Sequence, residues 1–151
     1  MNQEPTFKRL QAADIDFLHG LCEATMRPYV ESTFGAWNSE AVRAGLLEGL
    51  KAGGFRGIYL GDERIGAFAI EHHGSHIQIE QLFIQKEFQN RGIGAQLVRA
   101  TIGQGQARGK PVRLRVLASN PSKRLYERLG FLVVEQTPQR FFMEYPAPTL
   151  Q

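Results

Sequence analysis

A strand-like run of the sequence passes directly into a helix-like run through a glycine-bearing stretch, Gln89-Asn90-Arg91-Gly92-Ile93-Gly94. Glycines at such a junction leave backbone N–H groups uncovered. An uncovered helix N-terminus attracts anions, because its first four N–H groups lack partners in the helix and the macrodipole adds about half a positive charge there. The stretch therefore predicts a cradle for a phosphate group.

Two familiar phosphate-binding motifs do not fit this stretch. A dinucleotide fingerprint needs a third glycine where Leu97 stands, and a P-loop needs a Gly-Lys-Ser/Thr run, which is absent. What remains is Gln89-x-x-Gly92-x-Gly94, followed further along the chain by the segment NPSKRLYERLGF at residues 120–131. Their joint occurrence, in this order, is more specific than either piece alone.

The elements ahead of the glycines alternate between strands and helices. Residues 6–10 look like a short strand, and apolar residues at helical spacing predict a helix over 12–26, which Pro28 should end or kink. Ser39 predicts the cap of a second helix over residues 40–51. Two strands at 55–61 and 64–73 then follow, and the pattern predicts a hairpin between them around Gly61-Asp62.

The next strand, residues 76–84, changes its hydrophobic parity. Ile77 and Ile79 share one parity, whereas Leu82 and Ile84 occupy the other. A β-bulge near Glu80 would produce this switch and splay the strand from a neighbour. A strand buried on both faces is the alternative, and Phe83 is consistent with it.

Beyond the glycines, a helix from residue 93 is expected to fade out through the glycines at 103, 105 and 109. A strand follows at 112–117, then a helix capped by Ser119 or Asn120, with Pro121 at its first position and Gly130 at its end. Strands at 131–136 and 140–146 close the chain. This order predicts an α+β or mixed α/β sheet of about seven strands with about four helices on both faces.

Composition bounds the class of protein. The 151 residues, 42% of them hydrophobic, predict one domain over residues 1–151, and no apolar run resembles a signal peptide or membrane span, so we expect a cytoplasmic protein. Cys22 is the only cysteine, which excludes an internal disulfide and favours a small buried helix residue over a reactive thiol. The net charge of +3 is a mild excess, and the aromatic residues do not interleave with the basic ones as nucleic-acid stacking requires.

The two quoted segments and the order of elements resemble the GNAT superfamily of acetyl-coenzyme A-dependent N-acetyltransferases, over nearly the whole chain. The resemblance implies a twisted, mostly antiparallel sheet with a bulged strand at 76–84. It also implies that acetyl-CoA is the cosubstrate and that a tyrosine, here Tyr126, lies near the coenzyme sulfur. The residues that it assigns to coenzyme binding are Leu82, Phe83 and Ile84 through their backbone, and Gln89, Asn90, Arg91, Gly92, Ile93, Gly94, Ala95 and Asn120.

The chemistry of amine acetylation suggests roles for two residues. The reaction needs a base for the ammonium proton, an N–H donor for the developing oxyanion and an acid for the leaving thiolate. Tyr126 can serve as the acid. Glu80 stands where many family members place a carboxylate that acts directly or through water, although it can equally be an exposed strand residue, and the histidines His72, His73 and His76 are alternative bases.

One residue departs from the family pattern. In many members an asparagine precedes the tyrosine by one residue more than here, so Ser119 stands at the asparagine position and Asn120 is either a helix cap or a coenzyme contact. No carboxylate lies at a metal-ligand spacing from the histidines, so we expect no metal.

The sequence gives weaker evidence for the identity of the acceptor substrate. In the family, the segment joining the first two helices shapes the acceptor pocket, and here it contains Tyr29, Glu31, Phe34 and Trp37. Tyr29 and Trp37 are candidate pocket walls because each has a polar group, while packing is the default for Phe34. Glu31 is a candidate partner for a cationic amine.

The sequence thus favours transfer of an acetyl group to a primary amine of a small molecule or peptide, by direct attack in a ternary complex. A coenzyme A-binding sensor without catalysis is the alternative. We expect no nucleic-acid or membrane partner, and the closing strands leave open whether the chain forms a homodimer.

Overall fold

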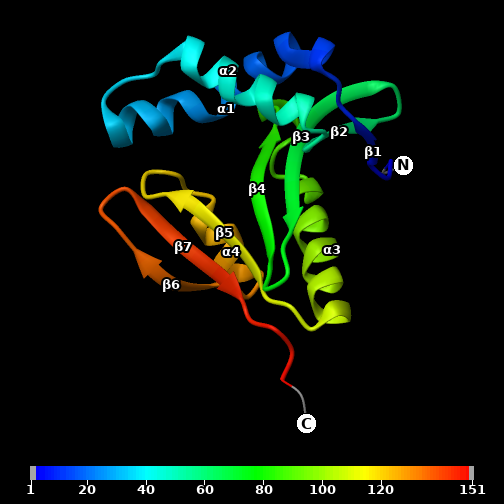
Figure 1. Ribbon diagram of the computed structural model, residues 1–151, viewed down its shortest axis with the longest axis vertical. Helices are drawn as coiled ribbons and strands as arrows, with labels where there is room; N and C mark the ends of the chain where they lie inside the picture. Colours follow the sequence, from blue (N-terminus) through cyan, green and yellow to red (C-terminus); the bar gives the residue numbers. More distant parts are fainter. Residues whose placement is uncertain (1–2, 150–151) are drawn as a thin grey trace.

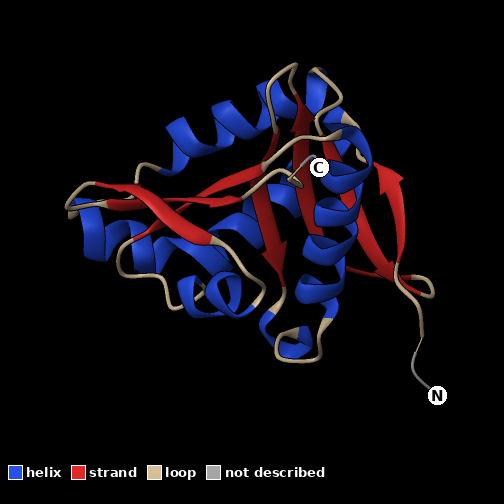
Figure 2. Cartoon of the chain, turned by 90° about the horizontal axis from the view of Figure 1, so that it is seen from below, coloured by secondary structure: helices blue, strands red, loops and turns tan. Residues whose placement is uncertain are grey.

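The computed structural model describes residues 3–149, and within them one mixed sheet carries helices on both faces (Figures 1 and 2). The strands of this sheet, in chain order, are β1 (Thr6–Arg9), β2 (Phe55–Leu60), β3 (Glu63–His72), β4 (Ile77–Ile84), β5 (Val112–Leu117), β6 (Leu132–Gln136) and β7 (Arg140–Tyr145). The α-helices are α1 (Ile15–Phe34), α2 (Ser39–Lys51), α3 (Ile93–Arg108) and α4 (Lys123–Arg128). The 3₁₀ turns are η1 (Ala12–Asp14) and η2 (Lys86–Phe88).

The strands lie in the order β1-β2-β3-β4-β5-β7-β6, and every neighbouring pair except β4–β5 is antiparallel. The mostly antiparallel, seven-stranded GNAT-like sheet expected from the sequence is confirmed. No helix within residues 3–149 combines the length and the apolar character needed to cross a membrane.

The parity switch in β4 comes from a β-bulge. Ala69 of β3 pairs with Gln81, but the next residue, Ile70, pairs with Ile79, so Glu80 is the extra residue. Ile79 therefore packs with α3, and Phe83 packs on the opposite face with α1 and α2. The structure thus decides between the two alternatives in favour of the bulge.

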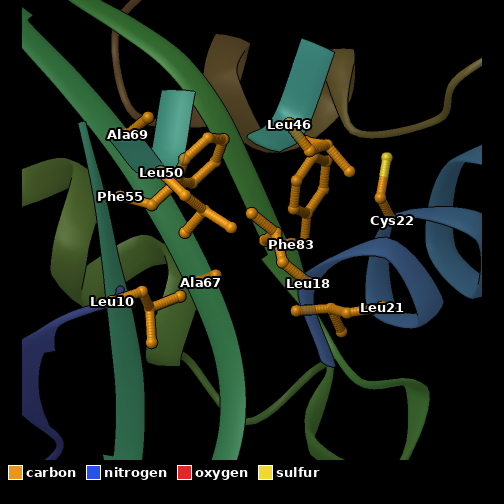
Figure 3. Packing of buried hydrophobic residues seen from close by; sticks show 10 residues of the cluster. All are labelled: Leu10, Leu18, Leu21, Cys22, Leu46, Leu50, Phe55, Ala67, Ala69 and Phe83. Carbon is orange, nitrogen blue, oxygen red and sulfur yellow. The ribbon is translucent and has the colours of Figure 1, made fainter. Parts of the chain in front are cut away.

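The core is divided between the two faces of the sheet. Between the sheet and helices α1 and α2 lies a cluster that includes Leu18, Leu46, Phe55 and Phe83 (Figure 3). On the other face, Val98 and Ile102 of α3 pack with Val112 and Leu114 of β5 and with Tyr126 of α4. The alternation of apolar residues along β5 is therefore explained by one covered face.

Helix α1 does not stop near Pro28 but continues to Phe34, where Gly35 adopts a left-handed conformation with φ of 86°. Of the two expected outcomes, an end or a kink, the helix end is therefore wrong, and α1 accommodates one missing backbone hydrogen bond at Pro28. Arg27, next to Pro28, forms ion pairs with Glu23 (2.7 Å) and Glu31 (3.0 Å), which lie before and after the proline in the helix.

Three smaller expectations about helix ends also need correction. Helix α4 begins at Lys123 with Ser122 as its N-cap, so neither Ser119 nor Asn120 caps it and Pro121 is not its first residue. Helix α2 is capped by Asn38, whose Oδ1 accepts from Ala41 N–H (3.0 Å), while the hydroxyl of Ser39 bonds His19 (3.0 Å). Helix α3 was expected to fade out through Gly103, Gly105 and Gly109, but it stays regular across the first two and runs to Arg108, with Gly109 as its C-cap, because its buried residues keep packing against the sheet.

Candidate active site

The parallel strands β4 and β5 separate part of the way along their length. Their ladder contains only Ile77–Ile79 of β4 and Val112–Leu114 of β5, and beyond it the strands diverge beneath α1 and α2 (Figure 1). We call this divergence the fork. A groove of about 1270 Å³ lies at the fork. Among residues 3–149, no strand pairs with the β5-facing backbone edge of residues 80–84, so this edge can bond an extended ligand.

The groove brings together most of the residues that the sequence singles out. Those that line it are Tyr29, Trp37, Glu80, Leu82, Phe83, Ile84, Gln89, Asn90, Gly92, Ile93, Gly94, Ala95, Asn120 and Tyr126. Glu31 and Arg91 do not line it. Glu31 pairs with Arg27 on α1, and the Arg91 guanidinium lies 5.0 Å from the ring centroid of Phe88.

The glycine-bearing stretch forms a cradle at the N-terminus of α3. Gly92 is the N-cap, with φ of 83°, and Gln96 N–H donates to its carbonyl (2.9 Å). The N–H groups of the three residues between them belong to the first turn, where no intrahelical acceptor exists. A Cβ on Gly94 would lie 3.3 Å from Ile84 Cδ1, so glycine keeps the cradle open beside β4.

Gln89 fixes this cradle to the strand. Its Nε2 donates to the carbonyl of Ile84 at the end of β4 (2.8 Å), which ties the loop to the unpaired edge. Asn90 adopts a left-handed conformation, with φ of 62°. Neutral N–H donors and an unobstructed approach suit a pyrophosphate, and the unpaired edge suits an amide-bearing arm, so these residues fit coenzyme A.

Glu80 projects from the bulge toward β5 and is held there. Arg115 Nη2 lies 3.0 Å from Glu80 Oε2, and the Glu80 side chain is 25% exposed. The next β4–β5 pair after Ile79 and Leu114 would have been these two residues, so an ion pair stands where the ladder ends. The carboxylate is thus positioned at the apex of the fork with one oxygen bonded to arginine.

Tyr126 also lines the groove, from α4. Its ring packs edge-on against the buried Phe131, with centroids 5.9 Å apart. Burial raises the pKa of its hydroxyl to about 12. The phenol therefore keeps its proton at neutral pH and can donate it.

The loop between β5 and α4 forms hydrogen bonds within itself and with α1. Asn120 Oδ1 accepts from Ser122 N–H (2.9 Å), so this side chain caps a turn while lining the groove. Ser119 Oγ lies 3.1 Å from Thr33 Oγ1 and donates to the carbonyl of Tyr29 (3.2 Å). These contacts join the C-terminal half of α1 to the far side of the fork.

The hairpin-tip histidines lie elsewhere. His72, His73 and His76 do not line the groove. Burial, followed by the charges of Arg108 and Lys110, lowers the pKa of His72. Within residues 3–149, no three His, Cys, Asp or Glu side chains gather as a metal site would require.

Cys22 occupies the core under α1, as expected for a small buried helix residue, and is 7% exposed. Burial, with a smaller contribution from Glu23, raises the pKa of its thiol to about 11. The thiol is therefore protonated at neutral pH, which is the unreactive form.

We call the part of the groove on the α1/α2 face of the sheet the acceptor side. Tyr29, Phe34 and Trp37 line it, and Phe34 is 48% exposed. The indole Nε1 of Trp37 is buried and lacks a hydrogen-bond partner among the described residues. Packing was the default expectation for Phe34, but this ring faces the groove.

Sequence reasoning missed two residues of the acceptor side, Arg115 and Arg140. The alternation Val112-Arg113-Leu114-Arg115-Val116 signals that the arginines share a face. That this face is the one beneath α1, and that β7 places Arg140 on it, depends on strand order and register.

A family model described as an acetyltransferase (GNAT) domain matches residues 28–142, which is more than half of the chain. No curated protein sequence matches significantly.

Many solved structures share the fold. A PaiA N-acetyltransferase from Thermoplasma acidophilum, in complex with coenzyme A, is 18% identical with a TM-score of 0.71, covering 95% of this chain and 99% of that one. An acetyltransferase from Thermus thermophilus is 19% identical with a TM-score of 0.74, covering 94% and 96%. The ribosomal-protein-S18-alanine N-acetyltransferase of Escherichia coli is 15% identical with a TM-score of 0.68, covering 98% and 97%. The match to the family model, on a chain whose sheet forks above a glycine cradle, shows that this protein belongs to the GNAT acetyltransferase family.

Proposed function

We propose that the protein is an N-acetyltransferase that uses acetyl-CoA and acetylates a primary amine of a small molecule or peptide by direct attack in a ternary complex. The observation that carries this proposal is the groove at the fork, where the α3 cradle, the unpaired edge of β4, the Tyr126 hydroxyl and the Glu80 carboxylate meet. Family membership supports the acyl-transfer chemistry.

Coenzyme binding is assigned to the cradle and the strand edge. Backbone N–H groups of residues 90–95 would hold the pyrophosphate, and the edge of Leu82, Phe83 and Ile84 would pair with the pantetheine arm. When bound, acetyl-CoA supplies an acetyl group activated as a thioester. Gln89 contributes by holding the cradle against β4 rather than by a charge of its own.

The proton transfers are assigned to the two sides of the fork. Glu80, directly or through a water, takes the proton of the substrate ammonium, which frees the nitrogen lone pair for attack on the thioester carbonyl carbon. The carbon–nitrogen bond forms and the carbon–sulfur bond breaks. Tyr126, which its raised pKa keeps protonated beforehand, donates its proton to the departing sulfur, and the second proton that the acylated nitrogen must lose restores the phenol. The buried, protonated Cys22 supports a route without an acetyl-cysteine intermediate.

The test is calorimetric titration of acetyl-CoA and of free CoA into the native protein and a Gly94→Val variant. The valine would cover the N–H groups beside Ile84, so binding should disappear. Gly103→Val is the matched control, since a Cβ added at position 103 of the same helix meets no atom within 4 Å. Binding that Gly94→Val abolishes and Gly103→Val preserves supports the cradle.

Failure of the native protein to bind either compound would overturn the proposal. Binding without acetylation in a broad screen of primary amines would instead support the sensor alternative. The readout for turnover is release of the free CoA thiol, which does not depend on the identity of the acceptor.

A further inference from the structure

The mouth of the groove on the acceptor side is framed by an arginine and an aromatic ring. Arg140, at the start of β7, lines the groove, and its Cζ lies 5.2 Å from the ring centroid of Phe34 at the end of α1. Arginine stacked on an aromatic face keeps its planar set of N–H donors free for an anion. Among residues 3–149, no carboxylate lies within ion-pairing distance of Arg140.

The strand register places Arg140 near the reaction centre. Arg115 pairs with Phe142 and Leu117 pairs with Arg140, so Arg115 and Arg140 lie on the same face of the sheet, one diagonal step apart. Diagonal positions of this kind are separated by about 7–8 Å between Cα atoms. The Glu80 carboxylate bonded to Arg115 is therefore within reach of one small molecule that also touches Arg140.

The two arginines on this side of the groove differ in whether a carboxylate neutralises their charge. Arg115 is neutralised by Glu80 at 3.0 Å, and Glu71, the other carboxylate that lines the groove, lies 3.2 Å from His73. Arg140 remains as a positive group without an acidic partner among the described residues. A polyamine would meet this charge with a second cation, whereas an amine that also carries an anion would complement it.

The remaining wall is apolar and fixed in place. Met26, Tyr29, Val30 and Phe34 present apolar surface to the groove from α1, and Trp37 adds a further ring. The hydrogen bonds of Ser119 to Tyr29 and Thr33 hold this half of the helix across the fork. A ligand seated between Glu80 and Arg140 therefore has a preformed apolar surface beside it.

From this arrangement we propose that the acceptor is a small amino acid-like molecule with an amine, a carboxylate and an apolar or aromatic body. The amine lies at Glu80, the carboxylate binds the guanidinium of Arg140, and the apolar body packs on the wall formed by α1 and Trp37. The proposal rests on the proposed function and narrows its acceptor to a class. It makes Arg140 a specificity-determining residue that takes no part in proton transfer.

The test compares three probe molecules that share a phenyl ring on a short carbon chain. L-phenylalanine carries both groups, 3-phenylpropionate lacks the amine, and phenethylamine lacks the carboxylate. Each is titrated into the native protein with and without saturating CoA, and binding is followed by calorimetry and ligand-observed NMR. We expect phenylalanine and phenylpropionate to bind, and phenethylamine to bind at least about tenfold more weakly than phenylalanine, because a charge-assisted hydrogen bond to the carboxylate is lost.

Substitutions then connect this preference to Arg140. Arg140→Gln should weaken both carboxylate probes about tenfold or more and leave phenethylamine unchanged, while Arg140→Lys should retain part of the affinity because it keeps the charge without the planar donors. Arg113→Gln is the matched control. Arg113 lies on the same face of β5, pairs with Glu144 at 2.9 Å and does not line the groove, so its loss should change none of the three affinities.

Three results would overturn the proposal: no binding of any probe, phenethylamine binding as tightly as phenylalanine, or equal losses in the Arg140 and Arg113 variants. Its failure is separable from failure of the proposed function. A protein that binds acetyl-CoA and releases its thiol with other amines, but ignores the carboxylate probes, is an acetyltransferase with a different acceptor. A protein that does not bind acetyl-CoA contradicts the proposed function itself, whether or not the three probes bind.

Discussion

At the scale of single residues, the site contains two groups that burial holds in the protonated form. Burial raises the pKa of Tyr126 to about 12 and that of Cys22 to about 11. Both residues line the groove, Cys22 from α1 and Tyr126 from α4, and the proposed function assigns protonation of the leaving thiolate to Tyr126. The same physical effect therefore provides a proton donor at one position and an inert thiol at the other.

Removing the Tyr126 hydroxyl should slow turnover without abolishing it. We expect Tyr126→Phe to lower kcat by about 100-fold or more, since general acid catalysis is typically worth about 100- to 10,000-fold, and to leave CoA affinity unchanged. With a pKa of about 12, the phenol stays protonated between pH 6 and 10, so the variant and native pH–rate profiles should have the same shape there. An unchanged kcat in Tyr126→Phe would contradict this role, and a basic limb near pH 8 that vanishes in the variant would contradict the raised pKa.

Glu80 and Arg115 should behave as a base and its positioning residue. Glu80→Gln removes the proton acceptor and should lower kcat strongly, while CoA affinity persists because the cradle is untouched. Arg115→Gln should lower kcat less, and Arg115→Lys should recover part of the loss by restoring the positive charge beside Glu80 Oε2. Steady-state kinetics at saturating acetyl-CoA measures the loss of kcat in each variant, and titration with CoA is the control for coenzyme binding. Full activity of Glu80→Gln would assign the base elsewhere.

Cys22 should affect stability at high pH and not the chemical step. The unfolded thiol ionises near pH 9, whereas the folded thiol does not until about 11, so the unfolded state releases its proton first and stability falls as pH rises between these values. Cys22→Ala should retain turnover and should lose less unfolding free energy between pH 8 and 10 than the native protein. Urea unfolding across that range measures the difference, and loss of turnover in a folded variant would favour a covalent route.

At the scale of elements, the site depends on two features of strand and helix. The bulge at Glu80 turns Gln81 and Phe83 toward α1 and frees the edge that faces β5. The uninterrupted α1 carries Tyr29 and Phe34 past Pro28 to the far side of the fork. The groove therefore depends on the extra residue in β4 and on the continuation of α1 beyond its proline.

Two glycines of α3 should respond in opposite directions to alanine. A Cβ at Gly103 meets no atom within 4 Å, so Gly103→Ala should raise the unfolding free energy by about 0.5–1 kcal/mol through higher helix propensity. A Cβ at Gly105 would lie 2.8 Å from the backbone oxygen of Lys110, so Gly105→Ala should destabilise by about 1–3 kcal/mol through overpacking. Chemical denaturation compares them, and equal effects would mean that the helix shifts to accommodate the methyl group.

At the scale of the whole molecule, the sheet consists of two parts joined by a short ladder. Strands β1–β4 meet β5, β7 and β6 through three paired residues only, Ile77–Ile79 with Val112–Leu114. The groove is lined by residues of both parts, from Leu82 on β4 to Tyr126 on α4, so a ligand that fills it would contact both. Binding should therefore stabilise the association of the two parts as well as the site.

Acetyl-CoA should raise the melting temperature and protect amides on both sides of the fork. At a concentration of 100 Kd, the added stability is about 2.7 kcal/mol. Hydrogen exchange should slow in residues 80–84 and in the β5–α4 loop together, and a single cooperative transition would support the expected single domain. Protection confined to α3, or two separate transitions, would contradict the coupling.

The amino-acid sequence by itself was sufficient for the order of the strands and helices and for the glycine-bearing start of α3, because each depends on the chemistry and spacing of neighbouring residues, and its resemblance to known proteins implied the family. It left a bulge in β4 and a strand buried on both faces as alternatives, and the register with β3 decided between them. Helix ends were less predictable: α1 continues past Pro28 to Phe34, and Asn38 rather than Ser39 caps α2. Only the tertiary structure decided that Arg115 meets Glu80 and that Arg140 faces the same groove. Those contacts join separate strands, and their register is set by packing over the whole sheet, which no local spacing contains.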